Sequence, residues 1–62
     1  MGETHRAIAD LSALLQQDPA HREALMRRGI LYRKALLGHQ AKTDFDAACR
    51  LGEEKACGVG QD

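Results

Sequence analysis

Apolar residues recur at helical spacing in three successive segments of the chain. The first segment, about residues 3–17, carries Leu11, Leu14 and Leu15 among several alanines, a pattern that favours an amphipathic helix. It ends at Asp18-Pro19, because the residue before a proline is pushed out of the helical region. We therefore expect the first helix to stop just before this proline.

The second segment, about residues 20–36, carries a narrow stripe at positions i, i+4, i+7 and i+11. The stripe consists of Leu25, Gly29, Tyr32 and Leu36. A glycine inside a helix costs up to about 1 kcal/mol relative to alanine. We therefore expect a neighbouring helix to approach closely at Gly29, and we expect Gly38 to break the helix.

The third segment, about residues 40–51, repeats Ala41, Phe45 and Ala48 at i, i+4 and i+7. Gly52 follows it, where a left-handed cap is expected. The glycine-rich tail, residues 58–62, is expected to fray. Strand-like alternation is lacking, so the pattern predicts a single all-α domain over residues 1–62, with short loops between antiparallel helices.

The first and third segments resemble each other at a fixed offset. A shift of 34 residues carries Ala7 to Ala41 and Leu11 to Phe45. The same shift carries Asp10 to Asp44, and we expect these two aspartates to have a structural role. A period of this length, made of two helices and two turns, is typical of tetratricopeptide repeats.

The residues between these segments are similar to the same family. Its consensus has a large residue, a Leu-Gly pair, a Tyr, an Ala-x-x-x-Phe and a closing Pro. Leu25 stands at the large position and Arg28-Gly29 at the Leu-Gly position. The residues in register with the rest of the consensus are Tyr32, Ala41 and Phe45, and Pro19 matches the closing proline of a preceding repeat. The chain departs from the pattern at Glu53, which replaces the closing proline, and at Leu36, where the family often has a glycine turn. The resemblance implies an antiparallel helix-turn-helix fold of about one and a half repeats.

The resemblance also implies a function and the residues that carry it. The expected core is Leu11, Leu25, Gly29, Tyr32, Ala41, Phe45 and Ala48. In this family the second helix lines a groove that grips peptides, so the chain is expected to be a protein-interaction scaffold without enzymatic activity. The expected partner-binding residues are Glu23, Met26, Arg27, Ile30, Arg33, Lys34 and Leu37. Because repeat arrays need about three units and polar caps, a homodimer is expected as well, in which pairing buries either Met26, Ile30 and Leu37 or the apolar side of the first helix.

The charge balance bears on the alternative function. Three short helices also describe a helix-turn-helix domain that binds nucleic acid. Nine basic residues balance nine acidic ones, however, so the chain offers no electrostatic attraction to nucleic acid or to an acidic membrane. A cytoplasmic location is expected from the polar start of the chain, which is unlike a secretory signal.

Cys49 and Cys57, eight residues apart, are the two cysteines of the chain. Their spacing resembles that of Sel1-like repeats, relatives of the tetratricopeptide family that often bridge such a pair when exported. Without an export signal, reduced and buried thiols are expected in preference to a disulfide. A metal site with His39 is not expected, because no Cys-x-x-Cys or His-x-x-x-His element is present, and no cofactor is expected.

Overall fold

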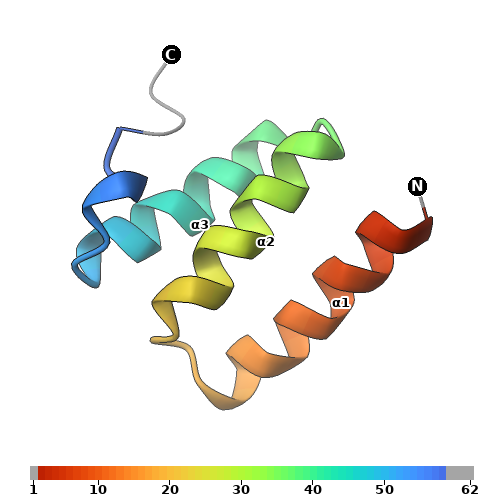
Figure 1. The fold of residues 1–62 in the computed structure, drawn as a ribbon, viewed down its shortest axis with the longest axis horizontal. Helices are drawn as coiled ribbons and strands as arrows, with labels where there is room; N and C mark the ends of the chain where they lie inside the picture. Colours follow the sequence, from red (N-terminus) through yellow and green to blue (C-terminus); the bar gives the residue numbers. More distant parts are fainter. Residues whose placement is uncertain (1, 59–62) are drawn as a thin grey trace.

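The computed structural model describes residues 2–58, and within them it contains three α-helices and no strand. The helices are α1 (Gly2–Gln17), α2 (Arg22–Lys34) and α3 (Gly38–Arg50), followed by a short 3-10 helix, η1 (Glu54–Ala56). Consecutive helices run antiparallel, and α2 lies between α1 and α3 (Figure 1). The predicted all-α, three-helix fold is therefore confirmed. The expected frayed tail falls almost wholly on residues 59–62, which lie outside the described part of the chain.

The three helices form a flat body of 29 × 28 × 14 Å. The shortest extent is about half of either of the others, and a view along it shows the three helices side by side in one layer (Figure 1). The exposed side chains of α2, among them Glu23, Arg27 and Ile30, lie on one side of the helix. This shape matters for the site described below, because a single layer exposes surfaces that a thicker bundle would cover.

The turn between α1 and α2 sets where α2 begins. The N–H of Asp18 donates to the carbonyl oxygen of Leu14 at 2.8 Å, and Pro19 then carries the chain away from α1. His21 is the N-cap of α2: its Nδ1 accepts a hydrogen bond of 3.1 Å from the N–H of Ala24. This cap places the first helical residue at Arg22, two residues after the predicted start.

The end of α2 differs from the prediction, which carried the helix through Leu36. The helix ends at Lys34, and Leu36 adopts a left-handed conformation with φ of 62°. The N–H of Leu37 donates to the carbonyl of Tyr32 at 2.8 Å, and that of Leu36 donates to Arg33 at 3.0 Å. These two bonds form a Schellman motif in which a leucine occupies the position usually held by glycine.

Gly38 does not break α2 as expected, because it is the first residue of α3. The end of α3 follows the prediction. Gly52 has φ of 102°, its N–H donates to Cys49 O at 3.0 Å, and the N–H of Glu53 donates to Ala48 O at 3.0 Å. α2 and α3 thus end in the same motif, once with leucine and once with glycine at the left-handed position.

Small residues on one helix face the large ring of another in the core. Phe45 is fully buried, and its ring lies against Gly29, where an added Cβ would stand 2.8 Å from the ring atom Cε1. The buried apolar residues are Leu15, Ala24, Leu25, Ala41, Phe45, Ala48 and Ala56. Of the expected core, Leu11 and Tyr32 are only half-buried and pack against this cluster. Leu15, Ala24 and Ala56 were not in the expected set.

The short helix η1 folds back onto the end of α3 and is fixed there by a disulfide. Cys49 and Cys57 are bonded, with their Cα atoms 4.8 Å apart. Ala56, beside the bridge, is buried in the core. The expectation of reduced, buried thiols is not what the structure has: the sulfurs are paired, and Cys57 is exposed. The bridge forms because the turn at Gly52 reverses the chain and brings the two cysteines together.

Candidate functional site

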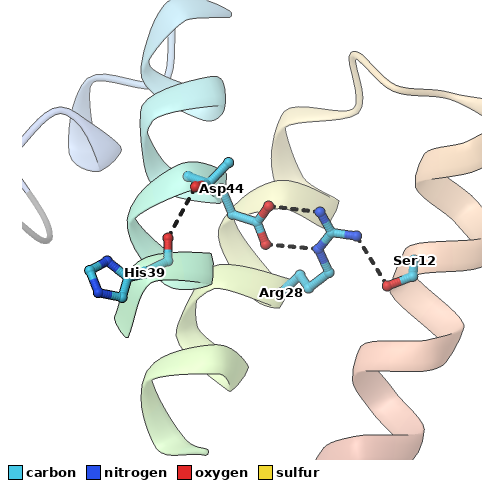
Figure 2. Close-up of polar contacts among 5 residues, drawn as sticks. Ser12, Arg28, His39 and Asp44 are labelled. Atoms are coloured by element: carbon cyan, nitrogen blue, oxygen red, sulfur yellow. Dashed lines mark hydrogen bonds and ion pairs between the residues drawn. The ribbon is translucent and has the colours of Figure 1, made fainter. Parts of the chain in front are cut away.

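One polar cluster joins all three α-helices. The Arg28 guanidinium on α2 donates two hydrogen bonds of 2.7 Å to the two carboxylate oxygens of Asp44 on α3. Its Nη1 donates a third, of 3.0 Å, to Ser12 Oγ on α1. Figure 2 shows Arg28 between these two partners. The same view draws a hydrogen bond within α3, from Thr43 Oγ1 to the carbonyl oxygen of His39 at 3.0 Å.

The hydrogen bonds of this cluster hold the three helices together. Asp44 is 2% exposed, and a two-pronged pair with arginine is the arrangement that best offsets the cost of burying a carboxylate. The hydrogen bonds to Asp44 raise the pKa of Arg28, so its guanidinium stays charged. It also lies 5.5 Å from the centre of the Tyr32 ring. Among residues 2–58, every buried polar side-chain atom has a hydrogen-bond partner. The cluster therefore has no unpaired polar atom to offer a ligand, as is usual for buried polar groups with a structural role.

An apolar hollow lies between α1 and α2. A hollow of about 410 Å³ is lined by Ala7, Asp10, Leu11, Arg27, Ile30 and Leu31. A second hollow of about 250 Å³ shares Leu11 and Arg27 with it and adds Leu14, His21, Glu23 and Ala24. Because the two hollows share residues from both helices, they form one continuous surface. We call it the groove face.

Helical spacing explains why these residues share one surface. Ala7, Leu11 and Leu14 stand at i, i+4 and i+7 on α1. On α2, Glu23, Arg27 and Ile30 follow the same spacing, and Leu31 lies next to them. Antiparallel packing of the two helices brings these stripes side by side. The result is an apolar floor with charged residues beside it.

Two of the large apolar side chains on the groove face are substantially exposed. Leu14 is 39% and Ile30 is 44% exposed. Singly exposed leucines are ordinary on protein surfaces, but these two belong to one hollowed surface together with half-buried Leu11 and Leu31. Covering a continuous apolar surface of this kind with another apolar surface lowers the free energy.

Both signs of charge border the groove face. Asp10 stands on the α1 side and Arg27 on the α2 side. Arg27 Nη2 lies 2.9 Å from Glu23 Oε2, one helical turn away, and both of these side chains are well exposed. An exposed pair of this spacing contributes about 0.3–0.5 kcal/mol, so Arg27 exchanges this partner for another at little cost.

The predicted partner-binding residues do not form one surface. Glu23, Arg27 and Ile30 lie on the groove face. Lys34 stands one turn after Ile30 on the same face of α2 and lines a further hollow near the start of α1, with Thr4, His5, Ala35 and Leu36. The remaining three are Met26, Arg33 and Leu37: Met26 packs against the core, Leu37 is half-buried in the turn after α2, and Arg33 is exposed.

The prediction missed the α1 half of the groove face. Ala7, Asp10 and Leu14 were not among the expected binding residues, and Leu11 was expected only in the core. The signal was present as the i, i+4, i+7 spacing on α1, but the prediction placed partner binding on the second helix and considered the apolar side of the first helix only as a surface for self-association. The two recurring aspartates also differ, because Asp44 is buried in the cluster while Asp10 is exposed on the groove face.

The described residues contain neither a metal-binding group nor a membrane-spanning helix. Residues 2–58 hold no group of three or more His, Cys, Asp or Glu side chains arranged to bind a metal ion. None of the helices described in this range is long and apolar enough to cross a membrane.

Comparison with known proteins adds no relative: no family model, no curated protein and no solved structure matches the chain.

Proposed function

We propose that this chain is a protein-interaction module, similar to a fragment of a tetratricopeptide array, which binds a partner protein through the groove face. The observation that carries the proposal is the hollow of about 410 Å³ between α1 and α2, floored by apolar side chains and bordered by Asp10 and Arg27. Apolar surfaces with a polar rim are typical of protein-binding sites. The hollow has room for the apolar side chains of a peptide or a second helix.

The sequence repeat supports the same function. In the resembled family, the helix equivalent to α2 carries the peptide-binding residues. Three residues of α2 also lie on the groove face: Glu23, Arg27 and Ile30. The close approach of Phe45 to Gly29 agrees with the small-for-large packing of such a repeat. One line of support concerns the surface and the other the core, and both rest on the resemblance to this family.

Nucleic-acid binding has weaker support. Arg28, on α2, is held by Asp44 and Ser12 inside the polar cluster, so its charge is not available to a phosphate. The net charge of zero provides no attraction to a phosphate backbone. Catalysis has weaker support too, because the one buried polar cluster of the described chain is closed by its own hydrogen bonds.

A displayed library of random peptides, panned against immobilised chain at low concentration, tests the proposal. We expect the selected peptides to shift the NMR amide signals of Leu11, Ile30 and Leu31. Ile30→Glu should abolish their binding, because it places a charge on the apolar floor. Leu36→Glu is the matched control, since Leu36 is also exposed but lies off the groove face. Peptides that bind Ile30→Glu as well as the wild type would refute the proposal.

A further inference from the structure

We propose that the partner seated on the groove face is a second copy of this chain, and that α1 and α2 of the two copies form a four-helix bundle at the dimer interface. This inference rests on the proposed function, because it names the partner of the same surface. It is carried by the symmetry of the groove face, by the placement of its charges and by the size of the chain.

The symmetry follows from the two antiparallel helices that border the groove. A two-fold axis running along the groove places α1 of the second copy over α2 of the first, and α2 of the second copy over α1. Every neighbouring pair in this arrangement is antiparallel, as in an up-and-down four-helix bundle. A two-fold interface of this kind uses the same surface on both copies, so it closes after two chains.

The apolar residues meet in this arrangement. Rotation about the groove axis keeps each residue at its own height along the groove. Leu11 and Ile30 line the same hollow and so stand at similar heights. Leu11 of each copy therefore faces Ile30 of the other, and the two hollows are filled by each other's apolar side chains. Leu14 is covered by the same rotation, which buries both substantially exposed residues of the groove face.

The charges are complementary in the same geometry. Asp10 and Arg27 border one hollow from opposite sides. Exchanging the two sides brings Asp10 of each copy opposite Arg27 of the other, so one pairing occurs twice. The weak, exposed contact between Arg27 and Glu23 does not prevent this pairing. Because the chain has no net charge, two copies also approach without long-range repulsion.

The size of the chain favours a dimer as well. A stable interface takes about 800 Å² from each partner, which is less than a fifth of the 4557 Å² accessible surface of this chain. A chain of this length buries only about 60% of its unfolded surface, and association adds the burial that its small core lacks.

Sedimentation velocity across the micromolar to millimolar range tests the inference. The wild type is expected to sediment as a dimer. Ile30→Glu should give a monomer with an unchanged helical circular dichroism spectrum, and the control Leu36→Glu should remain a dimer. A wild type that stays monomeric at millimolar concentration overturns the inference. So does a dimer that survives Ile30→Glu, because its interface would lie elsewhere.

A charge exchange tests the predicted pairing itself. Asp10→Arg alone sets like charges opposite each other at two places and should raise the dimer dissociation constant roughly tenfold. The double variant with Asp10→Arg and Arg27→Asp should recover most of that loss, although the carboxylate introduced at position 27 then stands beside Glu23 within α2. Failure of the double variant to recover affinity overturns the pairing and the two-fold geometry that predicts it.

The failure of this inference can be told apart from the failure of the proposed function. If the chain is monomeric but selected peptides bind the wild type and not Ile30→Glu, the partner is another protein and the interaction module stands. If neither self-association nor peptide binding depends on Ile30, both proposals fall.

Discussion

The ring of Phe45 lies against the backbone of Gly29, so that a Cβ added to the glycine would stand 2.8 Å from Cε1 and 3.0 Å from Cδ1 and Cζ. The ring is fully buried and has no open space into which to retreat. The contact explains why a mid-helix glycine persists in α2: the helix forgoes the better propensity of alanine to let α3 come close.

Gly29→Ala is therefore expected to destabilise the protein. Alanine improves helix propensity by about 1 kcal/mol, but overpacking a filled core costs about 1–3 kcal/mol. The net loss should be about 1 kcal/mol in urea unfolding followed by circular dichroism. Gly38→Ala is the control, because a Cβ there meets no atom within 4 Å and should leave stability equal or higher. A more stable Gly29→Ala would contradict the packing described here.

Removing Arg28 alone should be among the most damaging single changes. Arg28→Met leaves the carboxylate of Asp44 buried without its partner, and loss of one member of a buried pair costs about 3–5 kcal/mol. A chain of this size has a total stability of about 3–9 kcal/mol, so the variant should be largely unfolded or close to it.

The double variant Arg28→Met with Asp44→Leu supplies the control for this prediction. Two apolar residues of similar volume remove the buried charge together with its partner, and such replacements are often neutral. Most of the lost stability should return. If the double variant is no better than Arg28→Met, the damage arises from lost packing against Tyr32 and the core and not from the uncompensated charge.

Leu36→Gly should stabilise the protein, although it removes a large apolar side chain. Leu36 has φ of 62° and is 90% exposed, so it carries the steric cost of the left-handed region and packs little surface. That cost is about 1–2 kcal/mol, of which the greater chain entropy of glycine offsets part. We expect a gain of about 0.5–1 kcal/mol in chemical unfolding.

Gly52→Ala makes the opposite change at the equivalent cap. With φ of 102° and a Cβ that would lie 3.2 Å from Arg22 Nη1, alanine there should cost at least about 1 kcal/mol. Stabilities that move in opposite directions would identify backbone strain as the cause. A loss of stability in Leu36→Gly would instead mean that the leucine side chain contributes through the hollow it lines with Thr4 and His5.

The disulfide between Cys49 and Cys57 should set the stability of the end of α3. Closing a loop of about eight residues is worth about 2–3 kcal/mol in the chain-entropy account, so reductant should lower the melting temperature. A variant with both cysteines replaced by serine should melt at the same temperature as the reduced wild type, and reductant should not change its melting temperature. Free thiols in protein denatured without reductant would contradict the bridge. A persistent bridge weighs against the cytoplasmic expectation, since such bonds persist in oxidising compartments.

Periodicity predicted the number and order of the helices because each apolar stripe must be buried against a neighbour. The sequence also predicted that a neighbouring helix comes close at Gly29, because a glycine inside a helix lowers helix stability unless close packing requires it. Periodicity failed at the end of α2, where the stripe continues to Leu36 although the backbone has already turned. Periodicity alone cannot distinguish an apolar residue in a left-handed cap from one in a helix; the signal at Leu36 was the family pattern, which often has a glycine turn there.

The polar cluster was beyond the reach of the sequence for a different reason. Ser12, Arg28 and Asp44 are spaced by 16 residues at each step, which places one residue on each helix. Which of several arginines faces which aspartate depends on the rotation of each helix about its axis. The sequence marked Asp44 as a structural residue through its repeat, but nothing in the pattern assigned it Arg28 or Ser12 as a partner.

The position of α2 between two neighbours has a consequence for how the molecule opens. α2 is flanked on both sides, whereas α1 and α3 each have a side that no other described helix covers. α3 is further tied down by η1 and the bridge, and α1 has no covalent tie of this kind in the described chain. In the single chain, and so in the Ile30→Glu variant that is expected to be monomeric, local opening should therefore begin with α1 lifting away, and amide protons of α2 and α3 should outlast those of α1 in hydrogen exchange. The helix that forms half of the groove face is thus also the one held least firmly.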